Sequence, residues 1–177
     1  MLFDSFFSAL TSPALKAIAA HWHEARGDDP MPRWERLRPA RIAPHLTLVW
    51  AYRFDRASGD FFGRLAGERV MRAFEKNFRG LPLDEVLPAK IAARSRQMMR
   101  RVVTEPALHY VRGDLFRQGL RTVEGERIAL PLAGDDGGGI LGASAYDYPD
   151  YSPEHGAVEV LLQEGEWFSL APSPALA

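Results

Sequence analysis

The sequence contains no cysteine among its 177 residues. This absence excludes disulfide bonds, thiolate catalysis, zinc–thiolate sites and iron–sulfur clusters. It also excludes a flavin photosensor that works through a reactive cysteine. A chain without cysteine suits a reducing compartment, so we expect a cytoplasmic protein.

Long apolar runs are lacking as well, because none approaches the roughly 18 residues that a membrane-spanning helix needs. We therefore expect no membrane span. Neither sign of charge dominates, since the net charge is −1 and the isoelectric point is about 6.5. This balance gives no overall attraction to nucleic acid. The helix predicted over residues 88–104 has a basic outer face, but it lacks a helix-turn-helix partner, so we expect no nucleic-acid partner.

Catalytic and metal-binding motifs are also missing. The sequence has no nucleophile elbow, Walker loop, dinucleotide fingerprint or His-Glu-x-x-His motif. His21 and His23 lie two residues apart on a predicted helix, so they point in different directions and cannot share a metal. His109 is the best candidate for a haem ligand, although a single histidine on a strand is usually only hydrogen-bonded. We predict no enzyme activity, no metal and no cofactor.

Apolar and alternating segments indicate how the chain is organised. The predicted strands cover residues 46–55, 61–66, 107–118, 121–133 and 139–147. Gly67 joins the second strand to the first core helix, because a glycine leaves room for a tight turn. A longer helix follows over residues 88–104, and the segments 158–162 and 166–170 suggest an additional hairpin. This order predicts an α+β fold, with a five-stranded antiparallel sheet and helices on one face.

The apolar faces of two N-terminal helices predict a homodimer. Residues 2–10 form a short amphipathic helix, and Ser12-Pro13 begins a second helix that Gly27 ends. The core expected after residue 45 is filled without these helices, which leaves apolar surface for a second copy of the chain. The predicted interface residues are Phe3, Phe6, Phe7, Leu10, Leu15, Ile18 and Trp22.

Short motifs along the chain resemble a known family in their order and spacing. They are Trp22, Met31-Pro32-Arg33, Ile42-Ala43-Pro44-His45-Leu46, Leu48-Val49, Arg64-Leu65-Ala66-Gly67, Phe78-Arg79-Gly80 and Leu130-Pro131-Leu132. Together they resemble the PAS domain superfamily, and in particular the small, largely stand-alone PAS proteins common in alphaproteobacteria. The resemblance implies N-terminal helices and a linker over residues 1–45, a PAS-like core over 46–147 and a C-terminal extension over 148–177.

The same resemblance implies a sensor or interaction module, usually dimeric, that sometimes holds a small ligand between sheet and helices. Arg64 is the leading site residue, because a charge inside an apolar strand must be paired or reach water. We expect it to pair with Glu68, Asp84 or Glu85, or to receive an anionic ligand group. The residues expected to contact a ligand are Arg64, Trp50, Phe74, Met98, His109, Tyr110 and Ser144.

Three functions stay open on the sequence. The leading hypothesis is a sensory or regulatory module of bacterial signalling, with a small-molecule ligand and a signalling-protein partner. The alternative is a ligand-free dimerisation or adaptor protein, whose core is filled by Trp50, Phe74 and Met98. A further alternative is a small enzyme that uses the same pocket.

Overall fold

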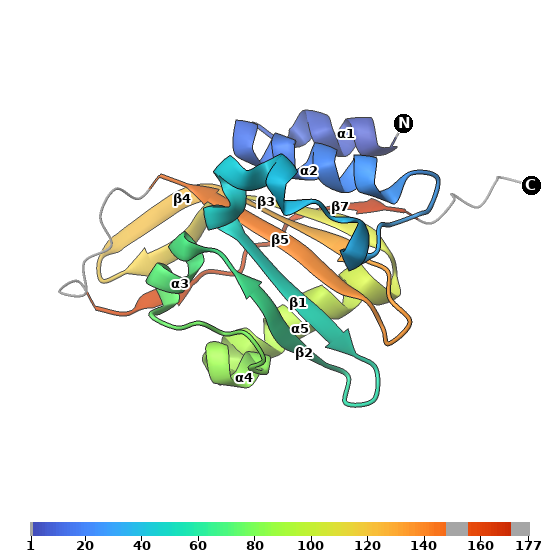
Figure 1. Cartoon of the computed structure of the whole chain (residues 1–177). Coiled ribbons are helices and arrows are strands. Elements are labelled where there is room, and N and C mark those ends of the chain that lie inside the picture. Colours follow the sequence, from blue (N-terminus) through green and yellow to red (C-terminus); the bar gives the residue numbers. More distant parts are fainter. Residues whose placement is uncertain (1, 148–155, 171–177) are drawn as a thin grey trace, which may run out of the picture.

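The computed structural model describes residues 2–147 and 156–170. A curled antiparallel sheet forms the centre of the molecule, with helices above and below it (Figure 1). The strands are β1 Val49–Asp55, β2 Asp60–Ala66, β3 Ala107–Gln118, β4 Arg121–Leu132, β5 Gly139–Tyr146, β6 Val158–Val160 and β7 Glu166–Ser169. The helices are α1 Leu2–Ala9, α2 Pro13–Arg26, α3 Glu68–Phe74, α4 Leu83–Val86 and α5 Ala89–Thr104, with 3-10 helices η1 Trp34–Arg36 and η2 Pro39–Leu48.

The strand order confirms the predicted α+β class. Five antiparallel strands lie in the order β2-β1-β5-β4-β3, and β6 and β7 both pair with β3. The predicted C-terminal hairpin is therefore wrong in its pairing, because its two segments extend the edge of the sheet one after the other instead of pairing together. The predicted extension also includes residues 148–155 and 171–177, which lie outside the described residues.

Helix α2 begins and ends where the sequence predicts. The Ser12 hydroxyl accepts a hydrogen bond from the Leu15 backbone N–H at 3.3 Å, and Pro13 occupies the first turn. Gly27 ends the helix with φ of 58°, a left-handed conformation that glycine adopts without steric cost.

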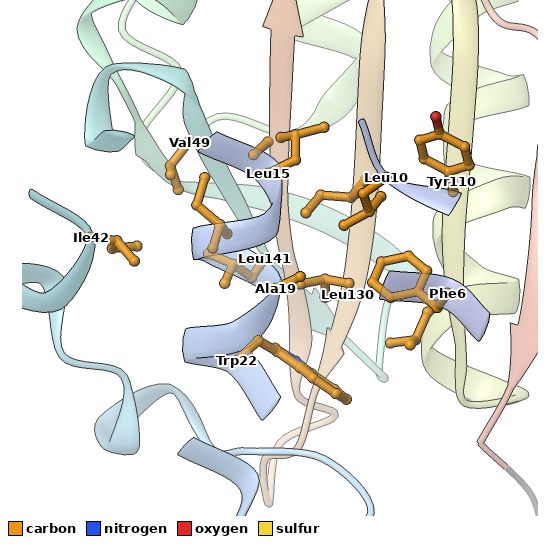
Figure 2. Close-up of a cluster of buried hydrophobic side chains, with 14 of the residues drawn as sticks. Phe6, Leu10, Leu15, Ala19, Trp22, Ile42, Val49, Tyr110, Leu130 and Leu141 are labelled. Carbon is orange, nitrogen blue, oxygen red and sulfur yellow. The ribbon is translucent and has the colours of Figure 1, made fainter. Parts of the chain in front are cut away.

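Helices α1 and α2 cover one face of the sheet, which we call the outer face. Figure 2 shows side chains of these helices packed against strand residues such as Leu130 and Leu141. The Trp22 indole N–H donates to the Pro131 carbonyl at 2.8 Å, which fixes α2 on β4. Both helices therefore share a buried core with the sheet. None of the described helices is long and apolar enough to cross a membrane.

This packing corrects the predicted dimer interface. Five of its residues are fully buried within their own chain, at no more than 1% exposure: Phe6, Leu10, Leu15, Ile18 and Trp22. The prediction treated their apolar surface as left over, but the outer face of the sheet uses it. Phe3 and Phe7 are half-buried against the same cluster.

The first predicted strand starts too early. Residues up to Leu48 belong to η2, where Pro39 and Pro44 favour tight turns, and β1 begins at Val49. Gly67 then joins β2 to α3 as predicted. Its N–H donates to the Val49 carbonyl at 2.7 Å, and a Cβ at this position would lie 2.3 Å from the Leu46 carbonyl oxygen. Only glycine fits so close to a neighbouring backbone.

Helix α3 is shorter than expected, because the apolar spacing of Val70, Met71, Phe74 and Phe78 predicts a helix that continues to Gly80. Glu75 adopts a left-handed conformation with φ of 50° and ends the helix directly after Phe74. Phe78 lies beyond this end but remains buried, with its ring stacked on Tyr52 at 5.2 Å between centroids. Helices α3, α4 and α5 pack on the second face of the sheet, which we call the inner face.

Candidate functional site

A small cavity of about 70 Å³ lies between the inner face of the sheet and helices α3 and α5. Its walls are almost entirely apolar and aromatic. The strand residues that line it are Trp50, Tyr52, Phe116, Arg127, Ser144, Tyr146 and Val160, and the residues from helices and loops are Val70, Ala73, Phe74, Phe78, Leu87, Ser95, Met98, Met99 and Leu162. Apolar walls with a few convergent polar groups are the usual character of a small-molecule site.

Arg127 of β4 is the one charged residue that lines this cavity within residues 2–147 and 156–170. Its side chain is buried, at 8% exposure, and its guanidinium lies 5.2 Å from the centre of the Phe116 ring. It donates to the Ser144 hydroxyl at 3.2 Å and to the carbonyl oxygens of Leu161 and Leu115 at 3.4 Å. These are long hydrogen bonds to neutral acceptors.

No ion pair of Arg127 exists among residues 2–147 and 156–170. Burial lowers the pKa of its guanidinium to about 10, and the nearby Tyr146 only partly opposes this shift. A buried cation without a partner anion is costly, and perturbed titratable groups in cavities often mark functional sites.

Ser144 joins the cation to the aromatic wall of the cavity. Its hydroxyl oxygen accepts from Arg127 and also from the Trp50 indole N–H, each at 3.2 Å. Gly142 makes this arrangement fit, because a Cβ there would lie 2.2 Å from the Trp50 ring. Since the Ser144 oxygen already accepts two bonds, its own proton is available for a further acceptor.

A larger groove of about 680 Å³ adjoins the cavity between α5 and the segment 161–167. Arg127, Met98 and Leu162 line both the groove and the cavity, so the guanidinium lies where the two meet. Arg94, Arg100, Arg101, Glu105 and Glu164 also line the groove.

A family model described as a PAS domain matches residues 10–144. The chain belongs to the PAS domain family. No match was found among curated proteins or among solved structures. The match ends within β5, so Tyr146, Val160 and Leu162 supply cavity walls from beyond the matched part of this PAS domain.

Four residues predicted to contact a ligand meet in this cavity: Trp50, Phe74, Met98 and Ser144. They come from β1, α3, α5 and β5, and the PAS fold brings them together between sheet and helices. Among the residues that the structure describes, no group of three or more histidine, aspartate or glutamate side chains could hold a metal ion.

Arg64 lies outside the cavity, which corrects the leading site prediction. Ala51 pairs with Leu65 and Tyr52 with Gly63, so Arg64 is the extra residue of a β-bulge. A bulge interrupts the alternation of side chains between the two faces. The Arg64 guanidinium stacks on the Trp34 ring at 4.2 Å and lies 3.9 Å from a Glu35 carboxylate oxygen, not beside the acids that were predicted.

His109 and Tyr110 are also outside the cavity. Adjacent strand residues face opposite sides of a sheet, so the two could not share one site. The His109 ring packs on Trp167 at 4.2 Å and lines the groove, while the Tyr110 hydroxyl donates to Glu126 on the outer face at 3.2 Å. Burial lowers the pKa of His109 to about 4, helped by Arg127 and Arg101, and burial raises the pKa of Tyr110 to about 12, helped by Glu126.

Sequence reasoning missed Arg127, which is the most distinctive group of the site. A signal for it was present, because a basic residue opens the apolar segment Arg127-Ile128-Ala129-Leu130. Alternation along β4 places Ile128 and Leu130 in the outer core and Ala129 in the inner core, and Arg127 shares the side of Ala129.

Proposed function

We propose that this chain is a cytoplasmic, non-enzymatic sensory or regulatory PAS module of bacterial signalling, which takes a small ligand into the inner cavity. The observation that carries the proposal is an apolar cavity lined by the Arg127 guanidinium, which has no ion pair among the described residues, and by the Ser144 hydroxyl that Arg127 contacts. Such a site can bind and orient a small molecule.

The origin of the cavity walls supports a regulatory role. Trp50, Phe74 and Met98 come from the PAS core, whereas Val160 and Leu162 belong to the C-terminal segment along β3. Arg127 also donates to the Leu161 carbonyl. A ligand that contacts both parts changes the equilibrium between docked and undocked states of the C-terminal segment. A signalling partner that binds one of these states then responds to the ligand.

One observation favours the alternative of a ligand-free adaptor. The cavity of about 70 Å³ is small beside ordinary ligand sites, which span roughly 300–1,000 Å³. An adaptor requires no occupant, so this alternative predicts that no small molecule stabilises the protein.

Native mass spectrometry of freshly purified protein, followed by thermal denaturation with a library of small molecules, tests the proposal. We expect a retained small molecule, or stabilisation by at least one compound. Filling the cavity with Ser95→Leu should abolish this effect, and Ala93→Leu on the exposed side of the same helix is the matched control. The adaptor is favoured if no mass is retained, no compound stabilises the protein and Ser95→Leu behaves like the control. Turnover of any compound would instead favour an enzyme.

A further inference from the structure

We propose that the ligand of the inner cavity is a short-chain monocarboxylate, whose carboxylate binds Arg127 and whose alkyl chain lies among Trp50, Phe74 and Met98. This inference rests on the proposed function and adds the chemical class of the ligand.

The number of donors on Arg127 is the first argument. A guanidinium has five N–H groups. Three of them are used within the described chain, one by Ser144 and one each by the carbonyls of Leu161 and Leu115. One N–H therefore remains on Nη1 and another on Nη2 without an acceptor among the described residues. Carboxylates accept such a pair of donors in parallel, with short charge-assisted bonds.

Charge is the second argument. Among the described residues, Arg127 is the single cation of the cavity wall and no carboxylate pairs with it. A ligand with one negative charge would neutralise the site, whereas a ligand with two would leave a new unpaired charge in an apolar space. The Ser144 hydroxyl can give the same carboxylate one further hydrogen bond, because its oxygen already accepts from Arg127 and Trp50.

The walls decide between an organic acid and an inorganic anion. Apart from Arg127 and a few hydroxyl groups, the cavity offers aromatic and aliphatic side chains. Phosphate would lose its hydration there without gaining enough donors, whereas an alkyl chain gains free energy from burial. The apolar walls therefore select an acid with a hydrocarbon body.

The volume limits the length of that body. A dry cavity of roughly 150 Å³ in another protein holds one benzene molecule. The present cavity is about half that size, at about 70 Å³. An alkyl chain of about three carbons has about half the heavy atoms of benzene and matches this space, while its carboxylate lies at Arg127, where the cavity meets the groove. Butyrate carries such a chain and is therefore the appropriate probe.

The groove provides a route that suits an anion. Arg94, Arg100 and Arg101 line it against two acids, Glu105 and Glu164, and Arg127 lies at its junction with the cavity. Excess positive charge along a groove raises the local concentration of anions.

The test compares four probes on the intact protein at neutral pH by isothermal titration calorimetry: butyrate, butyramide, 1-butanol and inorganic phosphate. Butyramide and 1-butanol have nearly the shape of butyrate but no charge. We expect butyrate to bind about tenfold more tightly than either, because a charge-assisted bond replaces a neutral one. This comparison needs no variant, so it does not depend on the folding of a mutant.

Variants then assign the effect to Arg127. Arg127→Met should abolish butyrate binding, and Arg127→Lys should weaken it, because lysine keeps the charge but loses the planar pair of donors. Arg53→Met is the matched control, since Arg53 is an exposed arginine of the same sheet.

Each other outcome overturns the inference. Equal binding of butyrate and the neutral probes would show a ligand site without an anion anchor, which leaves the proposed function intact. Equal binding of phosphate would show a general anion site. Binding of none of the four probes would exclude this ligand class, and only failure of the whole compound library would also overturn the proposed function.

Discussion

Glu126 and Arg127 are neighbours on β4, yet they carry opposite charges to opposite faces of the sheet. Both are buried, at 6% and 8% exposure. The Glu126 carboxylate accepts from the Thr11 backbone N–H at 2.9 Å, from the Thr11 hydroxyl and from Tyr110 at 3.2 Å. The Arg127 guanidinium has only long bonds to neutral acceptors within the described chain. The Glu126 carboxylate is thus stabilised by hydrogen bonds from its own chain, whereas the Arg127 guanidinium has no carboxylate partner in the part of the chain that the structure describes.

The first prediction concerns the cost of this unpaired base. Arg127→Met should raise the free energy of unfolding of the ligand-free protein by about 1 kcal/mol or more, because methionine removes a desolvated charge and keeps much of the volume. Urea denaturation measures the change. Arg53→Met should change it by less than about 0.5 kcal/mol, because Arg53 is exposed. A loss of stability in Arg127→Met would mean that the guanidinium serves mainly to join β3, β4 and the C-terminal segment.

The second prediction concerns Glu126 and acid. Burial acts to raise the pKa of its carboxyl group, but hydrogen bonds from Thr11, Ser12 and Tyr110 outweigh burial and hold the pKa below the ordinary value of 4.5. As the pH falls below 4.5, the Glu126 carboxylate therefore stays ionised in the folded protein, whereas in the unfolded chain it takes up a proton. The stabilisation is complete above pH 4.5 and is lost as the pH falls through the folded pKa.

Glu126→Gln should remove this part of the acid sensitivity. At neutral pH it should also cost about 1–3 kcal/mol, because one buried amide cannot accept all the bonds that the carboxylate accepts. Denaturant melts at several pH values, with Glu124→Gln as the exposed control, measure both effects. If the pH dependence of stability is the same in Glu126→Gln and in the native protein, the hydrogen bonds of Glu126 to Thr11, between α1 and α2, do not cause the acid sensitivity.

The third prediction concerns His109. Its pKa is lowered from 6.5 to about 4, chiefly because burial disfavours the charged ring. Between these two pH values His109 is protonated in the unfolded chain but neutral in the folded protein. The free energy of unfolding therefore falls as the pH drops from 6.5 toward 4. His109→Gln should flatten that slope. NMR titration of the ring gives an independent check, and a midpoint near 6.5 would contradict the prediction.

The fourth prediction separates folding from dimerisation in the N-terminal helices. Phe6 is fully buried and packs edge-on against Phe168 of β7 at 5.4 Å. Phe6→Ala should cost about 3–5 kcal/mol of unfolding free energy, because it leaves a cavity. Light scattering should find the same oligomeric state in the variant and in the native protein. Leu2→Ala is the control, since Leu2 is 39% exposed. A change of mass without a loss of stability would restore the interface that the sequence predicts.

Local sequence signals predicted the parts of this fold that depend on local chemistry. The Ser12-Pro13 start of α2, its end at Gly27 and the glycine turn at Gly67 all follow from residues next to one another. The five main strands and their antiparallel sheet followed from apolar alternation and from the resemblance to PAS proteins, whereas their order in the sheet was not predicted. Trp50, Phe74, Met98 and Ser144 were predicted to contact a ligand because the resemblance implies a ligand site between sheet and helices, and all four line the cavity.

The errors arose where distant parts of the chain decide the outcome. The cost of a charge inside an apolar strand made Arg64 the leading site residue, but Arg64 lies at a bulge of β2 and its guanidinium stacks on Trp34. The burial of Phe6 depends on a sheet face whose residues lie more than 100 positions away, such as Leu130. Arg127 was missed for the same reason, because its isolation from acids is visible only once the strands and the C-terminal segment are in place.

The most direct test of the account follows the four tryptophan indole N–H signals by NMR while butyrate is added. Trp50 donates to the Ser144 oxygen that also accepts from Arg127, whereas Trp22 lies on the outer face and Trp34 beside Arg64. We expect a saturable shift of the Trp50 signal, unchanged signals from Trp22 and Trp34, and no shift of Trp50 in Arg127→Met. A Trp50 signal that does not move with butyrate, or that moves equally with butyramide, would contradict the claim that Arg127 binds a carboxylate in the inner cavity.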